Sequence, residues 1–234
     1  MNQHITVKLA GIALVLAVAA GCTTTPNQSA STAPPVEWDG LQQVKINGLD
    51  TVYVKPGASL AGYTKIMVDP LQVSFKKGPD ANGGWRPNAF PINERDREKI
   101  RNSLAGIASR QLAVEMQKGG YQIVNAPAPD VLRVTAAIIK LDITAPDTMT
   151  GRSSYVVVAS KGSMTLVAEL RDSQTGDLLA RAVDYARDDS SFRYEVANSF
   201  TNAQAARTII GQWAHILRQR LDAARAADQP EAKN

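Results

Sequence analysis

Few side chains in this sequence could act as nucleophiles or bind a transition metal. The chain has one cysteine, Cys22, and two histidines, His4 and His215. Zinc sites need three or four nitrogen, sulfur or carboxylate ligands, and a serine or cysteine nucleophile usually needs a histidine beside it. Only His215 lies beyond the amino-terminal segment, and we expect it at a surface or boundary position. The chemistry within reach of Cys22 therefore depends on the residues around it.

An apolar segment precedes Cys22. Lys8 is followed by an uninterrupted run of apolar and small residues at 9–20, and small residues continue to Gly21. The run is shorter than the ~20 residues that a membrane-spanning helix needs. A cationic start, a short apolar core and small residues at its end are typical of a secretory signal peptide. The sequence thus predicts cleavage between Gly21 and Cys22, which leaves residues 22–234 as the mature protein.

Cys22 and the three residues before it resemble the bacterial lipobox, in which the cysteine thiol is acylated and the cysteine becomes the first residue. Ala19 stands where the lipobox usually has leucine. The resemblance implies palmitate-type acyl chains on Cys22, which would hold the protein on a membrane, since each buried methylene contributes ~0.8 kcal/mol. Thr23, in place of aspartate, implies sorting to the periplasmic face of the outer membrane. A free core cysteine in a cytosolic protein and an uncleaved inner-membrane anchor remain as alternatives.

The charge and the motifs narrow the classes of function. The formal net charge is +4 at pH 7, with both signs interspersed along the chain, which does not indicate a nucleic-acid-binding surface. No phosphate-binding glycine loop, nucleophile elbow or H-E-x-x-H motif is present. We therefore expect no cofactor and no metal. After cleavage, no cysteine beyond the acylated one is available for a disulfide.

Carboxylates are the remaining groups with catalytic potential. Glycoside hydrolysis, for example, needs two of them at a defined separation. The candidates lie on strands, where most alternate outward, or in loops, and solvated surface carboxylates are the usual case. An enzyme is therefore the third alternative, and we expect a protein that is not an enzyme. The candidate acids are Asp69, Asp142, Glu169, Asp184, Asp188 and Asp189.

Composition divides the chain into a leader, a tether, one domain and a tail. Residues 1–21 form the predicted signal peptide. Residues 22–35 are rich in Ser, Thr, Ala and Pro and predict a disordered tether. Residues 36–228 carry periodic apolar patterns and predict a single periplasmic domain, and residues 229–234 are a polar tail.

The domain pattern begins with strands and a long helix. Asn47-Gly48 predicts a hairpin turn between strands at 44–46 and 51–54. Residues 63–75 predict a strand that bends or meets a sheet edge at Pro70, followed by a surface loop at 76–91. A helix is expected from a cap at Asn93 to Lys118, with Gly119 and Gly120 ending it.

Further strands and a second helix complete the pattern. The strands are expected at 121–124, 131–143, 164–172 and 178–186, and the last two form a hairpin over Gly176. Apolar parity changes near Ala136-Ala137, which predicts either a bulge or a central strand that is buried on both faces. Thr201 and Gln204 predict a capping box that opens the last helix. We expect a two-layer α+β domain with two amphipathic helices on one face of a largely antiparallel sheet.

Four segments of the domain, together with the lipobox, resemble the bacterial lipoprotein family catalogued as domain of unknown function 3313. They are Asp39-Gly40-Leu41, residues 54–56, YTKIMVDPLQV at 63–73 and LRDSQTGDLLARAVD at 170–184. The order of elements is also similar to the curli secretion lipoprotein and the TolB amino-terminal domain, at the level of fold alone. The family supplies no catalytic residues.

These observations lead to one expected function and one alternative. We expect a non-catalytic binding or structural lipoprotein that meets an envelope protein or a cell-wall partner. Candidate contacts are Trp85, Phe90 and Tyr155 at the start of an apolar segment at 155–158, although such aromatics more often cover a core edge. The alternative is a subunit of an envelope assembly or secretion complex, against which the short 155–158 segment argues, since a membrane strand needs ~9–11 residues.

Overall fold

A computed structural model describes residues 37–78, 92–143, 156–158, 162–187, 195–197 and 199–228. The predicted signal peptide, tether and tail therefore lie outside the described residues. The elements are β1 (Glu37–Trp38), β2 (Leu41–Val44), β3 (Thr51–Val54), β4 (Lys65–Val68), β5 (Gln72–Phe75), α1 (Glu94–Lys118), β6 (Gln122–Val124), β7 (Val131–Ile143), β8 (Val156–Val158), β9 (Gly162–Asp172), β10 (Leu178–Arg187), β11 (Glu195–Ala197) and α2 (Ser199–Asp228).

The main sheet is mixed, with more antiparallel than parallel contacts. Its strand order is β1-β2-β3-β10-β9-β7-β4-β6, with β5 also paired to β7. In this spatial order, each neighbouring pair from β1 through β2, β3, β10 and β9 to β7 is antiparallel. On the other side of β7, β4 and β5 run parallel to β7, and β6 runs parallel to β4. The predicted α+β class is confirmed, and the parallel edge is the part that strand patterns alone did not indicate.

Pro70 divides the strand predicted at residues 63–75 into β4 and β5. Proline has no N–H for a sheet ladder, so pairing stops at this point. Both strands nevertheless follow the same edge of β7, because Lys65 lies opposite Val131 and Gln72 lies opposite Ala137. The two short strands thus act as one interrupted parallel strand along β7.

The predicted bulge in β7 is present but lies further along the strand than expected. The register with β9 shifts between Ile139 and Asp142, and Lys140 has a positive φ of 52°. A bulge adds one residue and reverses the faces of the residues that follow. Ile138 before it and Leu141 after it are therefore both buried, at 1% and 6% exposure. The prediction near Ala136-Ala137 was wrong because small residues are tolerated on either face.

Both predicted hairpins and the first helix are present, but the first strand of the first hairpin is Leu41–Val44 and not 44–46, so its turn is longer than predicted. Gly48 and Gly176 have positive φ values of 85° and 75°, as their turns require. Asn93 accepts a hydrogen bond from the Asp96 backbone N–H at 2.9 Å and so caps α1. Gly119 caps the other end, after the basic residue Lys118.

The start of α2 differs from expectation, and the apolar segment at 155–158 contains a short strand. The helix begins at Ser199, so Thr201 lies inside it and does not open it. No glycine or proline lies between Ser199 and Thr201, so nothing in the sequence stops the helix from extending toward its amino terminus. Val156–Val158 forms β8, which pairs antiparallel with Glu195–Ala197 in a separate two-stranded sheet.

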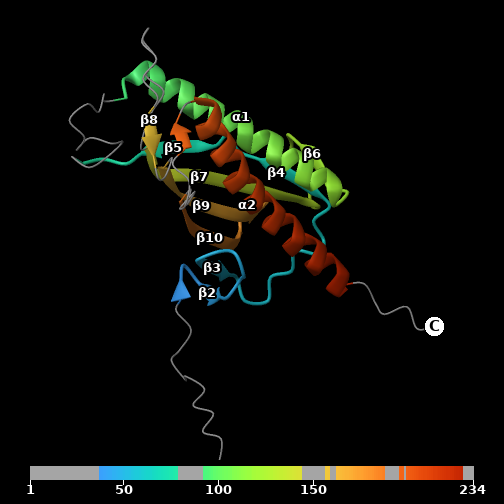
Figure 1. Cartoon of the computed structure of the whole chain (residues 1–234). Helices are drawn as coiled ribbons and strands as arrows, with labels where there is room; N and C mark the ends of the chain where they lie inside the picture. The colour runs from blue at the N-terminus through green and yellow to red at the C-terminus, as the bar shows by residue number, and fades with distance from the viewer. Residues whose placement is uncertain are drawn as a thin grey trace, which may run out of the picture. The chain divides into compact units, whose positions relative to one another are not determined.

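The helices contact each other and share two core clusters with the sheet (Figure 1). The first core cluster joins the amino-terminal halves of both helices to β5, β7 and β9. Its buried members are Phe75, Ile92, Leu104, Ile107, Ile138, Leu141, Ile143, Met164, Ala206 and Ile210. The second core cluster joins the carboxyl-terminal halves to β4, β7 and β10. Its buried members are Ile66, Met116, Tyr121, Leu132, Val134, Leu179 and Leu221.

Candidate functional site

A cavity of about 400 Å³ lies beside the first core cluster, between the two helices and the ends of β7 and β9. Helix α1 contributes residues from Asp96 to Ile107, and α2 contributes residues from Asn202 to Ile209. The α1 stretch covers about three helical turns, or roughly 17 Å, and the α2 stretch covers about two turns, or roughly 11 Å. The cavity therefore follows the groove between the helices and is floored by the sheet.

Polar and apolar lining residues separate along each element. The polar ones come from the first turns of the helices and from the strand ends: Asp96, Lys99, Asp142, Ser163 and Asn202. The apolar ones come mostly from the next turns and from the neighbouring strand positions: Ile100, Leu104, Ile107, Leu141, Ile143, Met164, Ala203, Ala205, Ala206 and Ile209. Ser103 is a polar exception on α1. The cavity thus has a polar mouth and an apolar interior.

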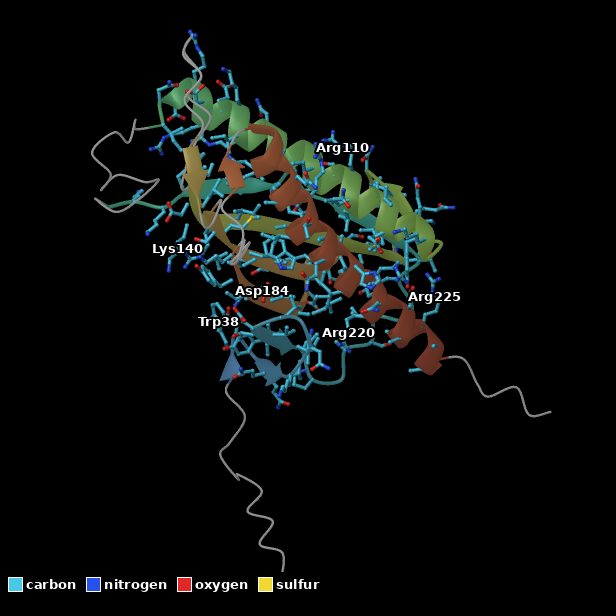
Figure 2. All side chains as sticks on the ribbon, in the orientation of Figure 1. Trp38, Arg110, Lys140, Asp184, Arg220 and Arg225 are labelled. Atoms are coloured by element: carbon cyan, nitrogen blue, oxygen red, sulfur yellow. The ribbon has the colours of Figure 1, made fainter. Side chains whose placement is uncertain are left out.

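Local backbone features shape the floor of the cavity. The bulge at Lys140 turns Leu141 and Ile143 toward the core, so both can line the cavity. Figure 2 shows Lys140 itself at the side of the sheet, apart from both helices. Gly162 begins β9 with φ +153°, and a Cβ there would lie 2.2 Å from the Asp142 carbonyl oxygen. Only glycine permits this close approach of β7 and β9 at the mouth.

Charges at the mouth are paired. The Lys99 ammonium lies 3.4 Å from Asp96 Oδ1, and the Lys99 side chain is 71% exposed. The Lys76 ammonium lies 3.2 Å from Asp142 Oδ2. An exposed pair such as Lys99–Asp96 contributes only ~0–1 kcal/mol, so Lys99 can exchange its partner at little cost.

Two of the candidate acids, Asp69 and Glu169, are held ionised by neighbours far from the cavity. Burial raises the pKa of Asp69, but hydrogen bonds from Thr135 and Arg133 outweigh it and leave the pKa below its usual value. Burial likewise raises the pKa of Glu169, and Arg171 and Arg181 lower it further than burial raises it. A general acid needs the opposite shift, so neither carboxylate is suited to that role.

Of the other candidate acids, the structure describes Asp142 and Asp184, and only Asp142 lines the cavity. Asp184 is 8% exposed and accepts hydrogen bonds from the Asp50 backbone N–H at 2.8 Å and from Trp213 Nε1 at 2.7 Å. It lies between α2 and the sheet, as Figure 2 shows. Asp142 lines the cavity mouth. Asp188 and Asp189 lie outside the described residues.

His215 takes part in an ion-pair cluster between the helices, at a half-exposed position as predicted. Its Nδ1 lies 3.2 Å from Glu115 Oε2, and Glu115 also accepts hydrogen bonds from Lys118 and Arg218. Lys118, the largest contributor, and the other donors lower the pKa of Glu115 to about 2. Across the described ranges, no group of three or more His, Cys, Asp or Glu residues could hold a metal ion.

The predicted contact and anchor residues are not placed by the structure. Trp85, Phe90 and Tyr155, as well as Gly21 and Cys22, lie outside the described residues. In the part of the chain that is described, neither helix is long and apolar enough to cross a membrane. The cavity was missed from the sequence, although small residues at 203, 205 and 206 on one turn of α2 were a usable signal for space beside the helix.

Comparison with solved structures finds distant likenesses. The PelC dodecamer from Paraburkholderia phytofirmans has 18% identity, covers 72% of this chain and 96% of its own, and gives a TM-score of 0.34. XCC0632 from Xanthomonas campestris has 14% identity, with 74% and 93% covered and a TM-score of 0.38. Lipoprotein GNA1162 from Neisseria meningitidis has 17% identity, with 64% and 98% covered and a TM-score of 0.26. A comparison with curated proteins finds no match.

The family resemblance noted in the sequence is confirmed over most of the chain. A family model matches residues 29–217, which include all four resembling segments and both core clusters except Leu221. The chain belongs to the family described as Protein of unknown function (DUF3313).

Proposed function

We propose that this protein is a non-catalytic binding module, anchored on the periplasmic face of the outer membrane by an acylated Cys22, that takes an apolar ligand into the cavity. The observation that carries the proposal is the cavity itself. Its volume of about 400 Å³, its apolar interior and its few polar groups match the usual features of ligand sites.

The state of the carboxylates supports binding without catalysis. A carboxylate whose pKa is raised toward neutral pH would be a candidate general acid or base. The pKa values of Asp69, Glu115 and Glu169 are instead lowered by cationic or hydroxyl partners. None of the three lines the cavity. Asp142, which does, forms an ion pair with Lys76.

We infer that both helices cover the same face of the sheet. Along β7, the buried Leu132 and Val134 share a cluster with residues of both helices, whereas Arg133 between them is exposed. On the neighbouring strands, Glu169 and Arg181 lie opposite each other and form an ion pair with 2.9 Å between Nη2 and Oε1. Trp38 and Asp39 cover Arg181, whose side chain is 11% exposed. The Arg133 side chain is 44% exposed, so the part of this second face around Arg133 would remain open to solvent or to the expected envelope protein or cell-wall partner.

The anchor sets where the cavity works. Residues 23–36 separate Cys22 from β1, and a fully extended chain of that length spans at most about 50 Å. Acylation at Cys22 would therefore keep the cavity within about that distance of the membrane, plus the width of the domain.

Two experiments test the anchor. Labelled palmitate should appear on the wild-type protein but not on Cys22→Ser, which should also leave the membrane fraction. Density separation of the membranes should place the wild-type protein with the outer membrane and Thr23→Asp with the inner membrane. Palmitate that never appears, or a Cys22→Ser protein that still sediments with membranes, contradicts the anchor.

A fluorescence experiment tests the cavity. The full chain with Cys22→Ser should enhance the emission of N-phenyl-1-naphthylamine, an apolar dye. Ala206→Phe in the same background should abolish most of this enhancement, because Ala206 lines the cavity and is 7% exposed. Ala223→Phe on the exposed side of α2 is the matched control. Equal enhancement in all three proteins rules out binding in the cavity.

The assembly-subunit alternative stays a prediction. Size-exclusion chromatography of the acylated protein in detergent distinguishes the binding module from the assembly subunit, since a subunit of a ring or channel should elute as a defined oligomer.

A further inference from the structure

We propose that the ligand of the cavity is an anionic phospholipid with a single acyl chain, drawn from the membrane to which the protein is tethered. This inference rests on the proposed function and names the class of ligand that the same cavity would take. Four features of the site carry it: its capacity, its aliphatic lining, the position of its charges and its distance from the membrane.

The capacity fits one acyl chain. An engineered cavity of ~150 Å³ accommodates the six carbons of benzene, or roughly 25 Å³ for each carbon. On that measure, the 400 Å³ cavity holds roughly 16 carbons. A phospholipid with two chains of this length would leave one chain outside in water, whereas a lysophospholipid would place its whole chain inside.

The lining is aliphatic. Leucine, isoleucine, methionine and alanine side chains form the apolar interior, and none of the described lining residues is aromatic. Sites for sugars, nucleotides and peptide aromatics commonly offer an aromatic face for stacking. The deepest residues, such as Ile107 and Met164, are 2% and 5% exposed and present only hydrocarbon and thioether groups. Apart from the Ser103 hydroxyl, the interior therefore offers surroundings that suit a methylene chain better than a buried polar group.

The charges stand where a head group would lie. The mouth carries Lys99, whose side chain is 71% exposed and whose ammonium lies 3.4 Å from Asp96 Oδ1. A phosphate can replace Asp96 as the partner of Lys99 while the acyl chain occupies the groove behind it. Asp96 and Asp142 line the same mouth, and Asp142 is paired with Lys76, so Lys99 is the lining cation that would contact the phosphate.

The tether supplies the source. Residues 23–36 keep the domain within about 50 Å of the lipid anchor, plus its own width. Single-chain phospholipids bury fewer methylenes than two-chain lipids and leave a bilayer more readily, since each buried methylene contributes ~0.8 kcal/mol. A membrane-tethered cavity for one chain can therefore capture such a lipid as it leaves.

The test uses lysophosphatidylglycerol as the displacing lipid and N-phenyl-1-naphthylamine as the dye, on the full chain with Cys22→Ser. We expect displacement at one lipid for each protein, strongest for chains near 16 carbons and at least ten-fold weaker for two-chain phosphatidylglycerol. Ala203→Leu should weaken the binding of lysophosphatidylglycerol at least ten-fold, because the half-buried Ala203 lines the cavity and the larger side chain would fill part of it. Ala223→Leu, exposed on the same helix, should change nothing.

A second pair of variants tests the head group. Lys99→Gln should weaken the binding of lysophosphatidylglycerol about two- to five-fold, as expected for one exposed charge pair. It should leave the binding of uncharged monopalmitoylglycerol unchanged. Lys45→Gln, at an exposed position on the β2–β3 hairpin, is the matched control and should affect neither lipid. Equal loss with both lysine variants would overturn the role of Lys99.

Several outcomes would overturn the inference. One is lipid binding that increases with acyl-chain length without an optimum, or that Ala203→Leu does not weaken. Another is that Ala206→Phe abolishes the dye emission as expected but lysophosphatidylglycerol does not displace the dye. In that case the proposed function stands and the lipid assignment fails. A third is a Cys22→Ser protein that binds the lipid while the acylated wild-type protein does not, which would assign the cavity to the protein's own acyl chain. Failure of the dye itself would remove both proposals.

Discussion

The ion-pair cluster around Glu115 provides the most demanding test of the packing between the helices. Glu115 is 8% exposed, lies on α1 and receives hydrogen bonds from Lys118 Nζ at 2.5 Å and from Arg218 Nε of α2 at 3.2 Å. These partners lower its pKa from 4.5 to about 2. We expect Glu115→Gln to destabilise the domain, because the carboxylate charge is lost while the largely buried Arg218 guanidinium, 19% exposed, keeps its own charge.

The expected loss of stability follows from the pKa. A shift from 4.5 to about 2 corresponds to at most about 3 kcal/mol, at 1.36 kcal/mol for each unit. The Lys118 side chain is 58% exposed, so water screens the largest contribution, and we expect about 1–2 kcal/mol at neutral pH. Urea unfolding followed by circular dichroism measures this difference directly.

The pH dependence gives an independent check. A carboxylate with a depressed pKa in the folded state stabilises the protein above its unfolded pKa, and this stabilisation is lost as pH falls toward the folded pKa. The difference between wild type and Glu115→Gln should therefore be full above pH 4.5 and should shrink between pH 4.5 and about 2.

Glu98→Gln is the matched control for this prediction. Glu98 is exposed on the same helix, so its substitution should change stability by less than about 0.5 kcal/mol. The reasoning is refuted if the two variants lose equal stability at neutral pH, or if the Glu115→Gln difference stays constant down to pH 2.

Three further substitutions probe single features of the fold. Gly162→Ala should cost at least about 2 kcal/mol, because its Cβ would clash with the Asp142 carbonyl at 2.2 Å, whereas Gly62→Ala, with nothing within 4 Å, should be neutral or slightly stabilising; thermal unfolding of both variants decides this. Asp184→Asn should cost about 1–3 kcal/mol in urea unfolding, because an NH₂ group replaces one of the two oxygens that accept from the Asp50 N–H and Trp213 Nε1, and an unchanged midpoint would refute that role. Lys140→Gly should stabilise the domain by about 1 kcal/mol, since φ is 52° there, and a lower melting temperature would contradict the strained bulge.

Local structure could be read from the sequence because neighbouring residues decide it. The limits of α1 follow from the Asn93 side chain at one end and from Gly119 at the other. The turns at Gly48 and Gly176 need positive φ, and glycine meets that need wherever it stands in the fold. The same holds for the predicted signal peptide, since a short apolar run before a cysteine is a property of the chain itself.

The parallel edge of the sheet and the place of the bulge were decided by tertiary structure. β4, β5 and β6 have the same strand pattern whether their partner runs parallel or antiparallel, so their direction depends on where α1 returns the chain. The bulge lies at Lys140 because Leu141 and Ile143 must face the first core cluster. A run of small and apolar residues fits several registers, and only the packed helices select one.

The cavity and the Glu115 cluster likewise needed the folded chain. Both bring together residues from α1 and α2, which are about a hundred positions apart, and no local pattern links such positions. The sequence by itself determined the residue types: small side chains near the start of α2 and charges at the ends of the helices. The tertiary structure decided which of them meet, because distance in space depends on how the layers pack and not on spacing along the chain.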